Sequence, residues 1–164
     1  MTMMHPASLA YPDANAVHAV QVIEDLPLVR KLICDLIEES GRYKVCALSD
    51  TESGALADFK VHHPAVVIVD LNLKQGSGLG FIKQVRKLEL PYRPSLIVVT
   101  NHGVAALKVA CLQAGADHFM DKSKDLPRLR ALIDAAVDAT ALGKASASPP
   151  SPPSPSVSAP GLRT

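Results

Sequence analysis

One short run of residues constrains the fold more than any other part of the chain. Residues 65–69 read Ala-Val-Val-Ile-Val, and Asp70 follows them directly. A run that is short, apolar at every position and rich in β-branched residues is typical of a parallel strand covered on both faces. The next residues are rich in Gly and Ser and lead into a helical pattern. We therefore expect Asp70 to lie at the carboxyl end of a buried strand, where open parallel sheets bind their ligands.

Strand and helix patterns alternate five times through the middle of the chain. The strands are predicted at residues 17–23, 44–49, 65–70, 95–100 and 117–121, and the helices at 28–37, 51–61, 78–90, 104–114 and 126–142. Because crossovers between parallel strands are right-handed, such units specify a parallel sheet with helices on both faces. The expected fold class is α/β, a flavodoxin-like (βα)5 doubly wound sheet with the common strand order 2-1-3-4-5.

The chain is long enough for one domain with tails. It has 164 residues, of which 48% are hydrophobic, and the ends differ in composition from the middle. Residues 1–16 mix Pro, Asp and Asn with isolated apolar residues, and Pro and Ser dominate residues 145–164. Segments of the second kind bury too little apolar surface to offset their ordering entropy. We expect a flexible arm over residues 1–16, a folded domain over 17–142 and a disordered tail over 143–164.

Charge and cysteine content exclude several classes of partner. The formal net charge of +1 creates no field that would gather nucleic acid or an anionic membrane. No stretch approaches the roughly 18 apolar residues of a membrane helix, and no signal peptide is recognisable. The three cysteines lack metal-ligand spacing, which indicates reduced thiols. A cytoplasmic protein without nucleic-acid or membrane partners is therefore expected.

Reactive side chains stand at the ends of four predicted strands. Glu24 and Asp25 follow the first strand, Asp70 ends the third, Thr100 ends the fourth and Lys122 follows the fifth. In the order 2-1-3-4-5 they meet at one edge of the sheet. Three carboxylates gathered there repel one another, and Mg²⁺ suits such hard oxygen ligands. A carboxylate can also attack phosphorus and hold the phosphoryl group as an acyl phosphate, while an ammonium and a hydroxyl neutralise its oxygens.

These motifs, with the intervals between them, resemble those of the response-regulator receiver family in its stand-alone, single-domain form. The similarity covers residues 16–142. It implies that Asp70 is the phosphoacceptor and that Glu24 and Asp25 are the acidic pair of the metal site. It also implies that the backbone carbonyl of Asn72 completes the shell around Mg²⁺.

The same resemblance assigns the remaining groups. It implies that Lys122 is the strand-5 lysine, that Thr100 is the switch hydroxyl and that Phe119 is the switch aromatic. The expected function is acceptance of a phosphoryl group from a sensor histidine kinase or a histidine phosphotransfer protein. The signal then passes to another protein through the surface around the fourth helix, fifth strand and fifth helix. Such a protein catalyses only its own phosphotransfer and dephosphorylation.

Three positions depart from the family pattern. Lys74 stands where many members have Pro, and Ser123 stands where Pro commonly follows the lysine, so both loops are expected to be less rigid. Asn101 is larger than the usual residue after the switch hydroxyl, which leaves the lifetime of the acyl phosphate open. The cognate kinase, the downstream target, homodimerisation and the role of the tail are open as well.

Rival interpretations remain for the same residues. An Asp at a strand end can simply cap the following segment, and Thr100 and Phe119 can be ordinary strand and core residues. The whole domain can be an interaction module of the same fold that is never phosphorylated. An aspartyl phosphatase of the haloacid-dehalogenase kind would need Asp where Asn72 stands, and a flavodoxin would need a hydroxyl-rich loop at residues 24–27.

Overall fold

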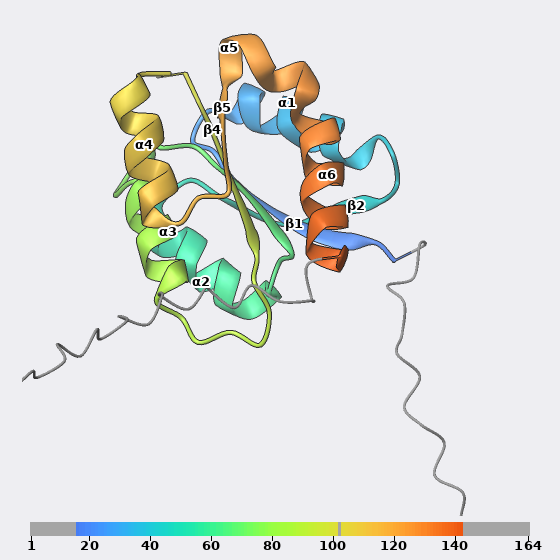
Figure 1. Ribbon diagram of the computed structural model, residues 1–164. Helices are drawn as coiled ribbons and strands as arrows, with labels where there is room; N and C mark the ends of the chain where they lie inside the picture. The colour runs from blue at the N-terminus through green and yellow to red at the C-terminus, as the bar shows by residue number, and fades with distance from the viewer. Residues whose placement is uncertain (1–15, 102, 143–164) are drawn as a thin grey trace, which may run out of the picture.

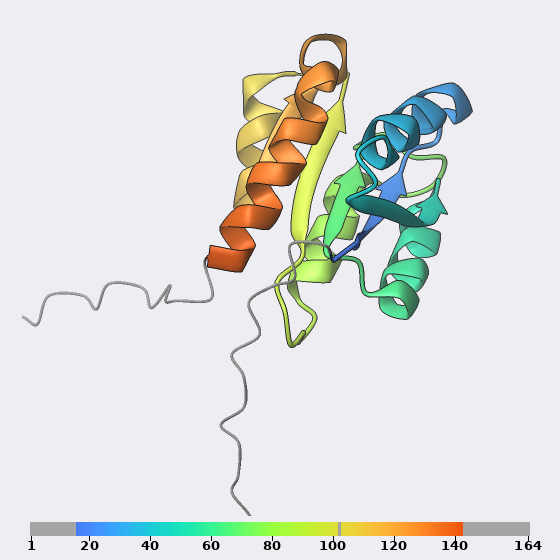
Figure 2. The ribbon, with the colours of Figure 1, turned by 90° about the vertical axis from the view of Figure 1, so that its right-hand side faces the viewer.

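The computed structural model describes residues 16–101 and 103–142, so most of the predicted arm and the whole predicted tail lie outside the described part. Five strands form one sheet in the order β2-β1-β3-β4-β5, and each neighbouring pair is parallel. Figure 2 shows the strand arrows pointing the same way. The predicted fold class and strand order are therefore confirmed.

Helices and strands alternate as the sequence pattern predicted. The strands are β1 (His18–Ile23), β2 (Tyr43–Ser49), β3 (Val66–Val69), β4 (Ser95–Thr100) and β5 (His118–Asp121). The helices are α1 (Pro27–Glu38), α2 (Glu52–His62), α3 (Gly78–Arg86), α4 (Ala105–Ala114), α5 (Lys122–Asp125) and α6 (Leu129–Leu142), with a 3-10 turn η1 (Leu126–Arg128) before α6. The C-terminal end of α3 and the start of α6 differ from the prediction.

Helix α3 ends at Arg86, whereas the apolar pattern predicted a helix to residue 90. The amides of Lys87 and Leu88 turn back to the carbonyls of residues 84 and 85, which closes the helix with tight turns. Pro91 also disfavours helical geometry at Leu90, the residue before it. Leu88 and Leu90 still pack against the core, so the apolar pattern continued past the end of the helix.

The last predicted helix, over residues 126–142, is divided in the structure. The Asp121 carboxylate caps the short helix α5 by accepting a hydrogen bond from the Ser123 amide at 2.9 Å. Pro127 follows in the turn η1 and lacks the N–H that a continuous helix would use. Helix α6 therefore begins only at Leu129.

The helices cover both faces of the sheet (Figure 1). Helices α1 and α6 pack on one face, where Ile33 and Ile133 meet Ile68 of the sheet in one buried cluster. Helices α2, α3 and α4 cover the other face, where the rings of Phe59 and Phe81 meet edge to face with centroids 6.1 Å apart. Because both faces are covered, β3 is buried throughout, as its uninterrupted apolar run requires.

Two further observations concern the state of the cysteines and the presence of membrane-spanning helices. Cys34, Cys46 and Cys111 are free thiols in the structure, and burial raises the pKa of each. Within residues 16–101 and 103–142, no helix has the length and apolar character needed to cross a membrane.

Candidate metal centre and phosphoacceptor site

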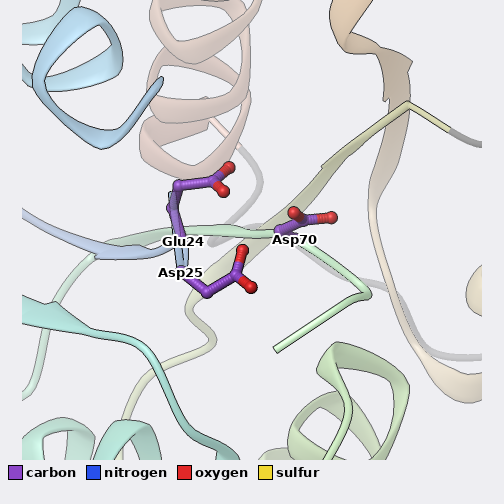
Figure 3. A group of neighbouring side chains, drawn as sticks. All are labelled: Glu24, Asp25 and Asp70. Atoms are coloured by element: carbon purple, nitrogen blue, oxygen red, sulfur yellow. The ribbon is translucent and has the colours of Figure 1, made fainter. Parts of the chain in front are cut away.

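Three carboxylates meet at the carboxyl edge of the sheet. Glu24 and Asp25 directly follow β1, Asp70 directly follows β3, and the two strands are paired with Ile23 opposite Val69. One oxygen of each carboxylate lies within 4.8 Å of the others, and Figure 3 shows the three groups gathered around one space. Strand pairing therefore brings together the acids that the sequence placed at separate strand ends.

The donor set fits a small hard cation. Oxygens that share one Mg²⁺ at its usual bond length lie at most about 4.2 Å apart, so small side-chain adjustments from the present spacing suffice. Asp25 is half-buried, which leaves the cluster a side open to solvent, whereas Glu24 and Asp70 are buried. Carboxylates with partial solvent access suit Mg²⁺, which keeps several of its waters when bound.

A buried ammonium lies between two of the acids. Lys122 Nζ is 2.7 Å from Asp70 Oδ2 and also contacts the Glu24 carboxylate. Burial alone would lower the pKa of Lys122, but its hydrogen bonds to Asp70 and Glu24 outweigh burial and raise that pKa. Burial raises the pKa of Glu24 even though Lys122 opposes this effect. One lysine thus faces more negative charge than it can neutralise, and a divalent cation would relieve the excess.

The loop between β1 and α1 holds Glu24 in place through its backbone and side chain. The Leu26 amide donates to Glu24 Oε1 at 3.1 Å, and the Glu24 amide donates to the Ser49 carbonyl at 3.0 Å. The Arg30 guanidinium donates to the Glu24 carbonyl at 3.3 Å. Pro27 begins α1 and supplies the backbone angle that a first helical turn requires. The acidic pair is therefore presented by an ordered turn.

The loop after β3 is closely packed beneath Asp70. The Asp70 amide donates to the Ile23 carbonyl at 2.9 Å, and the Asn72 amide approaches Asp70 Oδ1 at 3.4 Å. A Cβ atom at Gly78 would lie 2.1 Å from the Asp70 carbonyl oxygen, so only glycine fits there. Asn72 lies in this loop beside the acids, and the role of its carbonyl as a metal ligand stays a prediction.

Thr100 and Phe119 lie on the neighbouring strands, and their switch roles stay predictions. Thr100 ends β4, is fully buried, and its hydroxyl has no hydrogen-bond partner among the residues that the structure describes. A buried hydroxyl without a partner is costly unless a ligand oxygen can reach it. Phe119 is half-buried on β5 and packs against the core on the side of α2, α3 and α4.

Two further acids contact the Asp70 loop, and the sequence did not point to them. Asp50 Oδ2 accepts from Lys74 Nζ at 2.5 Å, and the Lys74 amide donates to the Asp50 carbonyl at 3.0 Å. Glu52 accepts a hydrogen bond from the Ser77 amide at 2.8 Å. The loop that we expected to be loose is therefore attached to the start of α2. No local signal could have revealed these contacts, because they join loops that are distant in the sequence.

Ser123, the second departure from the family pattern, also has local partners. Its amide and its hydroxyl donate to Asp121 Oδ1 at 2.9 and 2.5 Å. Cβ added at Gly103 would lie 2.7 Å from the other oxygen of the same carboxylate, so the loop before α4 packs closely on this turn. Asp121 therefore organises the segment that carries Lys122.

Curated proteins of known family are similar to this chain. It is 31% identical over 110 residues to the polar-differentiation response regulator DivK of Brucella ovis, covering 67% of this chain and 88% of that protein. It is 23% identical over 117 residues to the chemotaxis protein CheY of Bacillus subtilis, covering 71% of this chain and 95% of that protein. It is also 30% identical over 114 residues to the response regulator Rre1 of Synechocystis, covering 68% of this chain and about half, 48%, of that protein.

Solved structures share the fold. The signal receiver domain of the putative response regulator NarL from Mycobacterium tuberculosis superposes with a TM-score of 0.68 at 28% identity, covering 74% of this chain and 98% of that one. A LuxR-family two-component response regulator from Aurantimonas gives a TM-score of 0.70 at 24% identity, covering 76% and 87%. The protein-family model for the response regulator receiver domain matches residues 20–134 of this chain. This range includes the three acids, the lysine and the strand pairing that brings them together. The chain therefore belongs to the response regulator receiver domain family.

Proposed function

We propose that this chain is a response regulator whose phosphoacceptor is Asp70, and that it signals by changing which protein binds its surface. The observation that carries the proposal is the position of Asp70, buried beside Glu24 and Asp25 and bonded to Lys122 at 2.7 Å. An unreactive capping Asp would not need two more carboxylates and a buried lysine around it. Membership of the receiver family supports the phosphoacceptor role.

The transfer itself requires a nucleophile and groups that neutralise phosphoryl oxygens. A carboxylate oxygen of Asp70 attacks the phosphorus of a phosphohistidine, and the phosphorus–nitrogen bond breaks as the imidazole nitrogen takes its electron pair. The carboxylates of Glu24, Asp25 and Asp70 and the carbonyl of Asn72 would hold Mg²⁺, which supplies positive charge to the transferring oxygens. Lys122 already contacts Asp70, so its ammonium reaches the new phosphoryl group with little movement.

Thr100 and Phe119 supply a route from the site to the surface. The Thr100 hydroxyl, which has no hydrogen-bond partner within residues 16–101 and 103–142, can donate to a phosphoryl oxygen, which draws the end of β4 toward Asp70. Phe119 lines a surface groove between α4, β5 and α6, together with Leu112 and Met120. We propose that phosphorylation alters the position of Phe119 in this groove, and that a downstream protein detects the change.

The site assignment is tested by replacing the nucleophile alone. With Mg²⁺ and a small phosphodonor, the wild type should gain one phosphoryl group by intact-mass measurement, and Asp70→Asn should gain none, because the amide keeps the shape and loses the nucleophile. Asp58→Asn, on α2, is the matched control and should be labelled like the wild type. Equal labelling of Asp70→Asn would remove the site assignment, and an unlabelled wild type would favour the interaction module that is never phosphorylated.

The coupling role of Lys122 is tested separately. Lys122→Ala keeps the nucleophile and the acids, so it should still be phosphorylated, but it should lose the response at Phe119. NMR chemical shifts of the groove residues before and after phosphorylation measure this response. Wild-type shift changes in phosphorylated Lys122→Ala would show that the lysine does not couple chemistry to the surface.

A further inference from the structure

We infer that Glu52, the first residue of α2, is a positioning residue that holds the phosphoacceptor loop and thereby sets the metal affinity of the site. The inference rests on the proposed function, because it concerns the same Mg²⁺ site. Glu52 is neither a member of the acidic cluster nor part of the loop after Asp70. It begins the helix that follows β2, the strand at the opposite side of the sheet from β5.

Both the side chain and the backbone of Glu52 contact the loop. Glu52 Oε2 accepts from the Ser77 amide at 2.8 Å, and Oε1 accepts from the Gln84 side-chain amide at 2.6 Å. The Glu52 amide donates to the Gln75 carbonyl at 3.0 Å. Thr51 and Gln75 also form an isolated parallel bridge. One residue thus binds the end of the loop and the helix that follows it.

Two glycines make room for this carboxylate. A Cβ atom at Gly76 would lie 2.4 Å from Glu52 Cβ, and one at Gly80 would lie 2.6 Å from both carboxylate oxygens. Gly76 also has a φ of +76°, which other residues rarely adopt. The loop and the first turn of α3 are therefore shaped around the Glu52 side chain.

The position of Ser77 is transmitted to the metal site through the backbone. Ser77 forms an antiparallel bridge with Asn72, and the Gly78 amide donates to the Leu71 carbonyl at 3.1 Å. Asn72 supplies the carbonyl that we propose as a metal ligand. The carboxylate that fixes the Ser77 amide therefore also fixes the far side of this narrow loop.

The contact of Lys74 with Asp50 is less suited to this task. Their side chains are 59% and 35% exposed, and exposed ion pairs contribute little because water screens them and both side chains must be ordered. Glu52 is half-buried and accepts from a backbone amide with charge assistance, close against the backbone of Gly76 and Gly80. Glu52 thus supplies the rigidity that Lys74, in the position where many receivers have Pro, does not.

The test combines a measurement without metal and one with it. Amide hydrogen exchange in chelator reports the loop, and isothermal titration calorimetry with MgCl₂ reports affinity. In Glu52→Ala, the Ser77 amide should exchange at least about tenfold faster, because its hydrogen bond is lost. Its Mg²⁺ dissociation constant should rise about tenfold, the size of effect typical of groups that orient metal ligands.

Two variants separate positioning from charge and from a general loss of structure. Glu52→Gln can still accept from Ser77 and can donate to Gln84 once the Gln84 amide turns over, so both readouts should recover most of the way to wild type and lack only the charge assistance. Lys74→Ala should leave the exchange of Ser77 unchanged. Unchanged Ser77 exchange in Glu52→Ala would overturn the inference, and so would faster exchange with unaltered Mg²⁺ affinity.

Failure of the proposed function gives a different result. Asp25→Asn should lose Mg²⁺ binding while its Ser77 amide stays as protected as in the wild type. If the wild type binds no Mg²⁺ at millimolar concentration, the proposed metal site is wrong, and so is the role of Glu52 in metal affinity. If the wild type binds Mg²⁺ and Asp25→Asn does not, but Glu52→Ala behaves like the wild type, the positioning role alone is wrong.

Discussion

The edge of the sheet where the strands begin and the edge where they end both contain charged groups, but these groups serve different purposes. At the edge where the strands begin, the Arg86 guanidinium donates to the carbonyls of Gly115 and Pro94 and to the Asp117 carboxylate, at 2.8, 3.0 and 2.8 Å. At the edge where the strands end, Lys122 faces two carboxylates, a third lies beside them and the Thr100 hydroxyl has no described partner. The first edge satisfies its polar groups, whereas the second retains the capacity to bind a ligand.

The beginning edge has a second satisfied network, which attaches α6 to the sheet. Tyr43 starts β2, and its hydroxyl donates to Asp134 Oδ1 of α6 at 2.5 Å. Arg42 donates to Asp134 at 3.1 Å and to Asp138 at 2.6 Å. Groups that stabilise the fold and groups that can bind a ligand therefore lie at opposite ends of the same strands. Substitutions at one edge should change stability without changing ligand binding at the other.

The largest expected effect is at the beginning edge. Arg86→Ala should lower the free energy of unfolding by about 3 kcal/mol, because the carbonyls of Gly115 and Pro94 lose a charged donor and Asp117 keeps only the Arg93 guanidinium and the Leu96 amide. Urea unfolding should give the same loss with Mg²⁺ and with chelator. Arg93→Ala is the control, since Arg93 is exposed, and should cost less than about 1 kcal/mol. A loss at Arg86 that Mg²⁺ removes would mean that the two edges are not independent.

The next effect has the opposite sign and lies at the ending edge. Asp25→Asn should raise the free energy of unfolding in chelator by about 1 kcal/mol, because it removes a charge that repels Glu24 and Asp70 and that Lys122 only partly offsets. The wild type should gain roughly 1.4 kcal/mol from Mg²⁺ at about ten times its dissociation constant, and the variant almost nothing at that concentration. Thermal melts with Mg²⁺ and with chelator measure both changes. A destabilised variant in chelator, or a full Mg²⁺ response, would contradict a common metal-binding cluster.

The smallest expected effect concerns how the free energy of unfolding depends on pH at the edge where the strands begin. Burial and the hydrogen bond to Asp134 raise the pKa of Tyr43, so the folded state keeps a proton that the unfolded chain loses near pH 10. The unfolded state then binds fewer protons, and stability falls as the pH rises above about 10. Tyr43→Phe should cost about 0.5–1 kcal/mol at neutral pH and make this alkaline loss shallower.

Urea unfolding at several pH values between neutral and alkaline measures the Tyr43 effect. The slope should not disappear, because burial also raises the pKa of Tyr92. An unchanged alkaline slope in Tyr43→Phe would show that the link between β2 and α6 does not hold the proton. Phosphoryl labelling and Mg²⁺ binding should be unaffected by this variant if the two edges act separately.

Most of the fold could be predicted because its signals are local. The apolar runs of β3 and β4 are short and buried on both faces, and α4 ends at Gly115, a residue that readily adopts the left-handed conformation found there. The end of α3 was predicted too late, because Leu88 and Leu90 pack on the core without being helical. Apolar spacing reports burial, and burial continues where a helix has already stopped.

The acids and the lysine of the site could be predicted because each stands at a strand end. Strand order then places them, and no knowledge of side-chain contacts is required. The attachment of Glu52 to Ser77 could not be predicted, because it depends on how two loops approach each other. Lys122 contacts both Glu24 and Asp70, and its effect on signalling stays a prediction.

The pairing of β1 with β3 also has a kinetic consequence. Glu24 and Asp70 approach each other only when Ile23 lies opposite Val69, so one non-local strand pairing assembles the acidic cluster. Contacts of this kind require loop closure before they stabilise the chain, and a cation gains its ligands only after that closure. We therefore expect Mg²⁺ to act mainly by slowing the escape from the folded state, with little effect on the rate at which the chain first folds. The metal would then lengthen the lifetime of the folded receiver domain.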